Sequence, residues 1–312
     1  MRVLVTGATG WVGSRLLPRL LAEGHHVGAT RGGSSPSHES RLTPDESSQV
    51  DWRSLDLTNA LSVRNAVSGA WDVVVHLAGV ATHVEAEADP GHAWNVNAAG
   101  TARLCHALTA EGDITGLTVI VVSSGDVYGE GAGRPNVETD PPAPRSTYAA
   151  TKLGAELAAR GVAASTGLRI IVARPWPHTG PGQKLLLFPR WIRELKSAKA
   201  EQRIAKLKGD PDTVRDYSSV DDVVEAYVSL LDRGVPGETY NIASGKPLLF
   251  RDAVRILSDC LKWEATLDPD PARAGGAQYS VGDPTKLKRA TGWAPRIPLE
   301  RTLAEMVNAK ED

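Results

Sequence analysis

The sequence has few of the features that mark secreted, membrane-bound or nucleic-acid-binding proteins. It contains only two cysteines, Cys105 and Cys260, so no disulfide framework stabilises the fold and a reducing compartment is expected. No apolar run approaches the roughly 18 residues that a helix needs to cross a bilayer. The first residues, MRVLVTGATG, also lack an apolar signal core followed by a cleavage site. We therefore expect a cytoplasmic protein with no membrane partner.

An excess of charge of one sign is also absent. Lys and Arg number 35, Asp and Glu number 37, and the formal net charge is −2 with His neutral. A dedicated nucleic-acid-binding protein carries a strong basic excess, so no nucleic-acid partner is expected. The 312 residues are 41% hydrophobic and 23% charged, which is typical of a globular protein long enough to bury a core.

What the sequence does contain is a regular alternation through its first half. The runs at 3–5, 72–77 and 117–122 are almost continuously apolar and rich in β-branched residues, as in strands buried on both faces. The stretches 11–23 and 92–110 carry apolar residues at helical spacing. This order predicts the α/β class, with a Rossmann-like doubly wound parallel sheet that helices cover on both faces.

The chain changes character after Pro236, where the elements become shorter and turn residues more frequent. This change predicts a second, smaller α+β lobe. We assign 1–172, with a return segment at about 215–236, to the larger Rossmann domain. The smaller domain then comprises about 173–214 and 237–312.

A glycine-rich loop follows the first expected strand. Gly7 permits a tight turn, Gly10 allows the backbone to approach a pyrophosphate, and Gly13 lets the next helix lie close to the sheet. The amino end of that helix offers N–H groups and a positive dipole end to phosphates. The loop therefore predicts binding of a dinucleotide cofactor by Gly7, Thr9, Gly10, Trp11 and Val12.

The choice of cofactor depends on the residues that follow the second expected strand. An acidic residue there binds the ribose 2′-hydroxyl of NAD, whereas an arginine accepts the 2′-phosphate of NADP. The sequence there is TRGGSS, with Arg31 and no acid. Arg31 with neighbouring serines can hold a dianion, so NADP is favoured over NAD. The alternative is that Arg31 only stacks on the adenine.

Three side chains form a candidate catalytic group. Tyr148 and Lys152 are spaced i and i+4, so they share one face of a helix. A neighbouring ammonium lowers the pKa of a phenol, which makes proton transfer near neutral pH easier. Ser124 follows the strand at 117–122, where a hydroxyl points into the ligand crevice of an open α/β sheet. We expect these three residues to carry hydride chemistry, and we expect no metal.

These motifs resemble the extended, nucleotide-sugar-modifying branch of the short-chain dehydrogenase/reductase superfamily. The glycine spacing is GxxGxxG, YxxxK is present, and SSGDVYG is similar to the family's SSxxxYG segment, which places Ser124 on the catalytic Ser/Thr position. The resemblance extends from residue 3 to about 307. Beyond the glycine loop and Arg31, it implies cofactor contacts at Asp56, Leu57, Leu77, Ala78, Gly79, Asn97, Tyr148, Lys152, Pro175 and His178.

The resemblance also implies roles for three further residues. Asp126 falls where the 4,6-dehydratases of the family carry a Glu that moves a carbon-bound proton, so it is a candidate catalytic acid/base or a polar substrate contact. Arg215 and Arg273 are placed to bind the diphosphate of the substrate. The loop RPWPHTGPGQ departs from the family pattern because Pro177 replaces an Asn.

The region around Arg215 is similar to GDP-mannose 4,6-dehydratases and GDP-6-deoxy-D-mannose reductases. This implies an NADP(H)-dependent reductase of a nucleoside-diphosphate 4-keto-6-deoxy sugar, acting through Ser124, Tyr148 and Lys152, with the base and the sugar left open. One alternative is a 4-epimerase that retains NAD, and another is a protein that senses the dinucleotide without turnover. The resemblance further implies a homodimer that pairs through helices near Ala93–Ala110 and Tyr148–Ser165.

Overall fold

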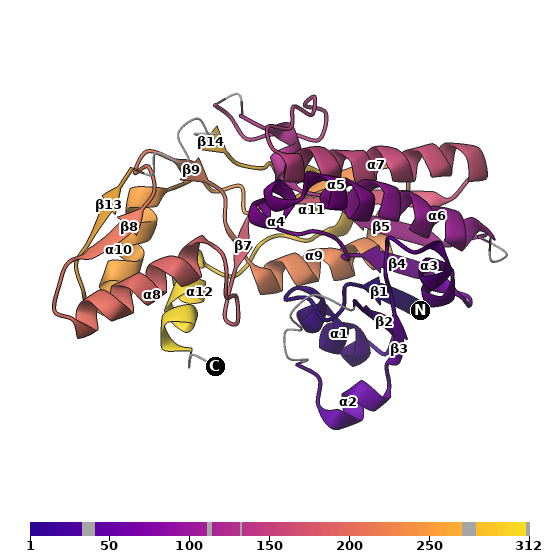
Figure 1. Ribbon diagram of the computed structural model, residues 1–312, viewed down its shortest axis with the longest axis horizontal. Helices are drawn as coiled ribbons and strands as arrows, with labels where there is room; N and C mark the ends of the chain where they lie inside the picture. The colour runs from indigo at the N-terminus through magenta and orange to yellow at the C-terminus, as the bar shows by residue number, and fades with distance from the viewer. Residues whose placement is uncertain (33–40, 111–113, 132, 270–278, 310–312) are drawn as a thin grey trace.

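The computed structural model describes residues 1–32, 41–110, 114–131, 133–269 and 279–309. The chain forms a large lobe built on one extended sheet and a smaller lobe of helices and short strands beside it, as Figure 1 shows. In the part of the chain that is described, no helix is long and apolar enough to span a membrane.

The large lobe is built on a seven-stranded parallel sheet. Every neighbouring pair of strands is parallel, which confirms the predicted Rossmann-like, doubly wound α/β fold. In spatial order the strands are β11 (Thr239–Ile242), β6 (Arg169–Pro175), β5 (Thr118–Val122), β4 (Val73–His76), β1 (Arg2–Thr6), β2 (His26–Arg31) and β3 (Asp51–Ser54).

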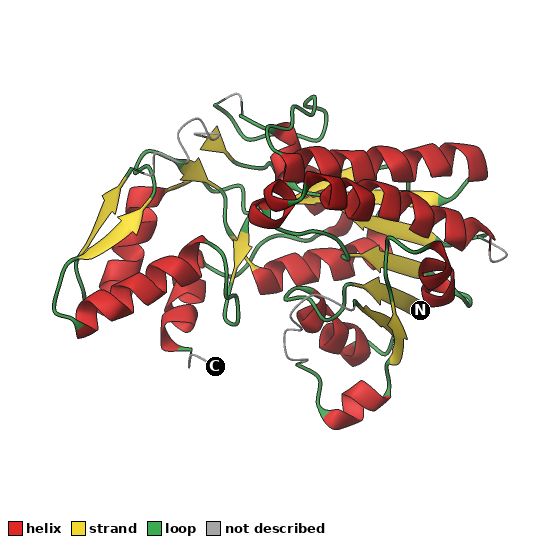
Figure 2. Cartoon of the chain, in the orientation of Figure 1, coloured by secondary structure: helices red, strands yellow, loops and turns green. Residues whose placement is uncertain are grey.

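Helices cover both faces of this sheet because alternate side chains of each strand point to opposite faces. In β1, Val3 and Val5 join the core under one helical layer, and Leu4 joins the core under the other. The first layer contains α1 (Gly13–Ala22), α9 (Val220–Arg233) and α11 (Thr285–Thr291), and the second contains α3 (Ala60–Val67), α6 (Gly100–Ala110) and α7 (Thr147–Thr166). Figure 2 shows the two layers on either side of the strands.

The strand order reverses between β1 and β4, because the chain runs outward through β2 and β3 and then returns to the other side of β1. In open α/β sheets, ligands bind outside the carboxyl ends of the strands at such a reversal. The glycine loop after β1 and the segment Leu77–Gly79 after β4 both lie at this place.

The smaller lobe has its own core. Phe188, Trp191 and Phe250 pack edge to face at its centre. Its helices are α8 (Leu187–Ala200), α10 (Phe250–Leu261) and α12 (Leu299–Asn308). One three-stranded sheet contains β12 (Leu248–Leu249), β9 (Val214–Arg215) and β14 (Tyr279–Ser280). Two strand pairs complete the lobe, β8 (Ala205–Lys208) with β13 (Ala265–Asp268) and β7 (His178–Thr179) with β10 (Ser218–Ser219). The remaining short elements are α2 (Pro44–Ser48), α4 (His83–Ala88), α5 (Pro90–Trp94), a π-helical turn η1 (Asn95–Ala99) and a 3-10 turn η2 (Gly125–Tyr128).

One expected domain boundary is wrong. We assigned 237–312 to the smaller lobe, but β11 lies at the edge of the large sheet, paired with β6. The helix α11 also packs on the large lobe, where Leu287 joins the core beneath α9. Sequence spacing could not reveal this return, because the other strands of the sheet all lie before residue 176 and several elements of the smaller lobe intervene.

The helix expected at 92–110 is present, and it contains an irregularity. The helix α5, the π-helical turn η1 and the helix α6 follow one another without a break. A π-helical turn widens a helix by one residue and often occurs at functional sites. Here the turn contains Asn97, whose buried side-chain amide makes hydrogen bonds to Val80 and Thr151, which lie outside this helix.

Candidate active site

The glycine loop is packed so closely that side chains are excluded at two positions. Gly7 has φ +68°, and a Cβ there would lie 2.7 Å from the backbone nitrogen of Ala78. A Cβ at Gly13 would lie 2.5 Å from the carbonyl oxygen of Gly7. At Gly10 the only near atom is that same carbonyl, at 3.1 Å. The backbone is therefore left bare at the amino end of α1, and this cradle fits a pyrophosphate.

A buried histidine holds the ends of β1 and β4 together beneath this cradle. The Oγ1 of Thr101 donates to the carbonyl of Asn97, so it accepts from Nε2 of His76 at 3.1 Å. Nδ1 of His76 then accepts from the hydroxyl of Thr6 at 2.8 Å, and Thr6 accepts from the Ala78 nitrogen. Burial and, to a smaller extent, the charge of Lys152 lower the pKa of His76 to about 3, so this histidine stays neutral.

Asn97 anchors the segment after β4. Its Oδ1 accepts from the Val80 nitrogen at 2.8 Å, and its Nδ2 donates to the Val80 carbonyl and to Thr151 on α7. A Cβ at Gly79 would lie 2.6 Å from Oδ1 of Asn97. The structure thus gives Asn97 a positioning role between the strand end and α7, and its cofactor contact stays a prediction.

The residues expected to meet the adenosine end lie at the ends of β2 and β3. The guanidinium of Arg31 lies 4.6 Å from the ring centre of Trp52 and is exposed. Asp56 accepts hydrogen bonds from the backbone and hydroxyl of Thr58, which lower its pKa, and it is exposed as well. Leu57 is buried in the core instead. Arg31 and Asp56 therefore present opposite charges at one edge of the sheet.

Trp11 joins the glycine loop to the segment that follows β6. Its ring is stacked on His178, with centroids 5.6 Å apart and planes at 4°, and its Nε1 donates to the Pro181 carbonyl at 3.3 Å. His178 donates from Nδ1 to the Trp176 carbonyl, and burial lowers the pKa of His178. The predicted residues Trp11 and His178 thus meet, although nothing in their spacing indicates it. Pro175 ends β6 just before this segment.

Ser124 and Tyr148 meet at the carboxyl end of β5. The Ser124 hydroxyl lies near enough to the phenol to influence its pKa, and it accepts from the Asp126 nitrogen at 3.1 Å. Burial raises the pKa of Tyr148, the nearby Asp126 raises it further, and the Ser124 hydroxyl lowers it. We expected Lys152 to lower the pKa of Tyr148. The pKa is raised instead, because burial is the largest influence on it. Tyr148 therefore keeps its proton at neutral pH.

Lys152 lies one turn further along α7 and is buried. Burial lowers the pKa of Lys152 to about 8, while Glu156 raises it. Glu156 itself accepts from Nε and Nη2 of Arg174 on β6, at 2.9 and 2.7 Å, and from the hydroxyl of Ser123. This buried group fixes α7 against β5 and β6, and sequence reasoning missed it, although Glu156 follows Lys152 at helical spacing.

His83 is a second residue that sequence reasoning missed. It begins α4, and its Nε2 lies 2.9 Å from Oδ2 of Asp126. Its ring centroid lies 4.8 Å from that of Tyr148. No spacing motif marks His83, because α4 reaches the catalytic residues only through the tertiary fold.

Of the two arginines expected to bind the diphosphate, the structure describes one. Arg215 on β9 lies 5.9 Å from the ring centre of Phe250 and donates to the Val214 carbonyl. Arg273 lies outside the described residues. The next residue, Asp216, is buried and accepts from Ser244, Gly245 and Gly282.

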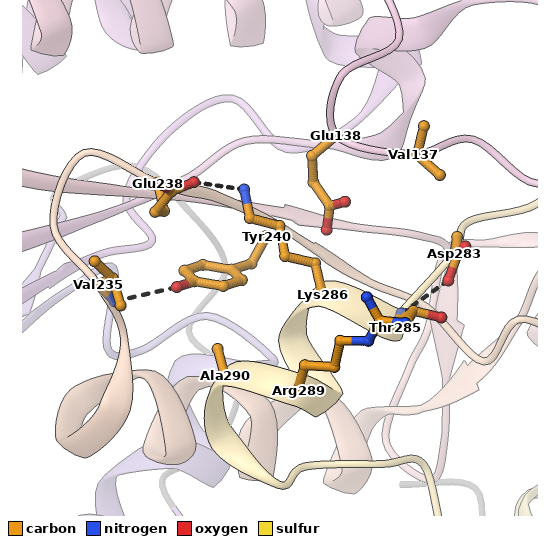
Figure 3. Close-up of a pocket in the computed structure, with 10 residues that line it drawn as sticks. All are labelled: Val137, Glu138, Val235, Glu238, Tyr240, Asp283, Thr285, Lys286, Arg289 and Ala290. Atoms are coloured by element: carbon orange, nitrogen blue, oxygen red, sulfur yellow. Dashed lines mark hydrogen bonds and ion pairs between the residues drawn. The ribbon is translucent and has the colours of Figure 1, made fainter.

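A cavity of about 640 Å³ lies elsewhere, between the edge strand β11 and α11. Figure 3 shows the bond between Lys286 and Glu238. The carboxylate of Glu138 also lies among the residues that line the cavity. The ring of Tyr240 lines it as well. None of the predicted catalytic or cofactor residues lines this cavity, so it is separate from the candidate active site.

Comparison with known proteins gives the family. A profile of the NAD dependent epimerase/dehydratase family matches residues 3–243. The chain is 34% identical to GDP-6-deoxy-D-mannose reductase of Pseudomonas aeruginosa over 98% of this chain and 96% of that protein. It is 29% identical to UDP-glucose 4-epimerase of Mycolicibacterium smegmatis, over 98% and 97%.

A solved structure supports the same assignment. The structure of RMD from Pseudomonas aeruginosa in complex with NADPH has a TM-score of 0.79 and is 31% identical, covering 98% of this chain and 97% of that one. The resemblance drawn from the glycine loop, YxxxK and Ser124 is thereby confirmed, as is the expectation of an enzyme. The chain belongs to the NAD dependent epimerase/dehydratase family.

Proposed function

We propose that this enzyme is an NADPH-dependent reductase of a nucleoside-diphosphate 4-keto-6-deoxy sugar. The observation that carries the proposal is the proximity of Ser124 to the buried phenol of Tyr148 at the carboxyl end of β5, on the same sheet as the glycine cradle. Burial keeps Tyr148 protonated, which is the form that a reductase needs as proton donor. Similarity to GDP-6-deoxy-D-mannose reductase supports this choice among the activities of the family.

The cofactor site follows from the residues that fit it. NADPH, when bound, supplies the hydride. The bare backbone at Gly7 and Gly10 binds the pyrophosphate, and Arg31 binds the 2′-phosphate through charge-assisted hydrogen bonds. Lys152, with its pKa of about 8, remains largely cationic at neutral pH and holds the nicotinamide ribose.

The substrate carbonyl lies between two hydroxyl groups in this proposal. Ser124 donates a hydrogen bond to the carbonyl oxygen and orients it. Tyr148 gives its proton to that oxygen as negative charge develops there, so the product leaves as a neutral alcohol. Arg215 and Arg273 bind the diphosphate, and binding far from the reacting carbon positions the sugar.

Asp126 has a supporting role in this scheme. Its carboxylate is engaged by His83 at 2.9 Å, and as an Asp it is one methylene shorter than the Glu that the dehydratases use. A carboxylate held in this way suits an electrostatic role better than abstraction of a carbon-bound proton. This favours reduction over dehydration.

The test is oxidation of NADPH, followed at 340 nm, with a panel of GDP- and dTDP-linked 4-keto-6-deoxy sugars. We expect turnover with at least one GDP-linked substrate. Tyr148→Phe removes the proton donor and lowers kcat by about 10²- to 10⁴-fold. The matched control is Tyr279→Phe on β14, which keeps wild-type rates. No turnover with any member of the panel contradicts the proposal.

A second candidate function is 4-epimerisation with retained NAD, which the similarity to UDP-glucose 4-epimerase favours. The two functions differ in how the cofactor is held. An epimerase returns the hydride to the same sugar and releases no cofactor between turnovers. Denaturing the purified protein and identifying the released dinucleotide separates them, because stoichiometric NAD supports the epimerase. A third alternative, sensing without turnover, predicts that Tyr148→Phe leaves the biological output unchanged.

We further propose a homodimer formed by α5, α6 and α7. Two large apolar side chains on these helices support it, because Trp94 is 46% exposed and Leu157 is 63% exposed. Exposed apolar side chains on neighbouring helices are typical of a contact surface. Substitution of Leu157 by Glu should yield a monomer in sedimentation experiments, whereas an unchanged mass contradicts this interface.

A further inference from the structure

The backbone carbonyl of Pro181 is held by two side chains of the large lobe. It accepts from Nε1 of Trp11 at 3.3 Å and from Nη2 of Arg15. A carbonyl oxygen has two lone pairs, so both bonds can form together. Trp11 belongs to the glycine loop and Arg15 to the first turn of α1, whereas Pro181 lies in the segment 178–183 at the start of the smaller lobe. The glycine loop is therefore fastened to that segment.

Arg15 occupies a place that is unfavourable for a cation. Its side chain is 5% exposed, and its buried Nε has no hydrogen-bond partner among the described residues. Burial lowers the pKa of Arg15, while the ion pair with Asp221 on α9, at 2.8 Å, raises it. The positive end of the helix dipole also opposes a cation in a first turn. Side chains that break a local rule in this way are concentrated at functional sites.

Arg19, one turn further along α1, has a more favourable place. It lies in the last turn, where the helix dipole favours a cation, and its side chain is 35% exposed. It also pairs with α9, through Glu225. In the described part of the chain, its side-chain bonds go to carboxylates. Both arginines thus tie α1 to α9, and Arg15 adds the bond to Pro181.

The segment 178–183 is cross-linked internally, so a hold on Pro181 reaches its other residues. The hydroxyl of Thr179 donates to Oε1 of Gln183 at 2.7 Å. Nε2 of Gln183 in turn donates to the His178 carbonyl at 3.1 Å. The ring of His178, which is stacked on the glycine loop, is therefore positioned together with Pro181.

We propose that Arg15 is a positioning residue that transmits occupation of the cofactor site to the segment 178–183. A dinucleotide favours the arrangement in which the glycine loop is fixed. Through Trp11 and Arg15 this ordering reaches Pro181, so the segment is held in one position at the start of the smaller lobe. Cofactor binding thus prepares the site of the nucleotide sugar. The identity of the two ligands in this inference rests on the proposed function.

The test is hydrogen–deuterium exchange of the backbone amides in 178–183, with and without saturating NADPH. In wild type, NADPH should slow this exchange about tenfold, and in Arg15→Met by less than about twofold. Methionine keeps an apolar stem and removes both donors, and Asp221, which is 50% exposed, tolerates the loss of its partner. Thermal unfolding and a fluorescence titration of NADPH show that each variant is folded and saturated.

Arg19→Met is the matched control, because it removes the neighbouring ion pair with α9 and leaves the bond to Pro181 in place. It should keep the wild-type response to NADPH. If Arg15→Met also keeps that response, the segment senses the cofactor without Arg15 and the inference is overturned. It is equally overturned if Arg19→Met loses as much as Arg15→Met, or if wild type shows no response.

A second measurement separates this inference from the proposed function. By linkage, the nucleoside diphosphate of whichever sugar supports NADPH oxidation should bind about fivefold or more tightly to wild type when NADPH is present, but not to Arg15→Met. Turnover without this coupling overturns the link to the sugar site and leaves the proposed function standing. The exchange measurement needs no sugar, so it still decides the role of Arg15 if no sugar is turned over. Failure of wild type to bind NADPH contradicts both.

Discussion

The two lobes handle charge in different ways. In the large lobe, Arg174 and Glu156 form an ion pair in which the side chains are 6% and 3% exposed. In the smaller lobe, Arg203 and Glu194 form a pair that is 40% and 30% exposed. The centre of the smaller lobe is apolar, with aromatic rings around Phe188.

This difference follows from what each lobe must hold. A buried ion pair is costly to desolvate, so it persists only when several hydrogen bonds satisfy both partners. On the carboxylate side this condition is met, because Glu156 accepts from Arg174 and from Ser123, and it ties the catalytic helix α7 to β5 and β6. The Arg203–Glu194 pair of the smaller lobe is partly exposed, so water can solvate both charges. Fixed geometry is therefore concentrated where Tyr148 and Lys152 are held.

The largest expected effect breaks the buried pair. Glu156→Gln leaves the Arg174 charge buried without its counter-ion, so the free energy of unfolding should fall by about 3–5 kcal/mol. The control is Glu194→Gln, which removes an exposed partner and should cost about 1 kcal/mol or less. Urea unfolding at pH 7 measures both. Equal losses at the two sites would show that the lobes do not differ in this respect.

A second prediction concerns pH and a buried histidine of the large lobe. His76 has its pKa lowered to about 3, whereas an unfolded histidine titrates near 6.5. The unfolded chain therefore binds a proton first, and stability is lost as pH falls below about 6.5. At pH 5 the loss attributable to His76 is about 2 kcal/mol relative to pH 7.

The measurement for His76 is the free energy of unfolding in urea at pH 7 and pH 5. His76→Gln cannot titrate, so the variant should lose less stability than wild type between these two pH values, even if it is weaker at both. Parallel profiles would mean that His76 becomes charged without cost in the folded protein, contrary to its burial between Thr6 and Thr101.

The smallest expected effect concerns an exposed charge of the large lobe. Arg31→Ala should raise the KM for NADPH about tenfold and leave the KM for NADH nearly unchanged, because only the 2′-phosphate loses its partner. Arg169→Ala, at the amino end of β6, is the control and should change neither. Equal effects on both cofactors would indicate that Arg31 only stacks on adenine. Stability should stay within about 0.5 kcal/mol in both variants.

Much of this protein could be predicted from local sequence. Strand and helix periodicities identified the α/β fold, because the alternation of buried runs and amphipathic stretches is a local property. The glycine loop and the pair Tyr148 and Lys152 are also local, since tight turns and helical spacing are set by neighbouring residues. Ser124 was found by its place at a strand end.

Other features depend on residues that are distant in sequence. The return of β11 to the sheet, the partnership of Trp11 with His178, and the contact of His83 with Tyr148 join segments between 65 and more than 160 positions apart. The pKa of Tyr148 belongs with them, because burial in the tertiary fold is the largest cause of its shift. The sequence determined which chemical groups are present, and only the tertiary structure decided which of them are close enough to act on one another.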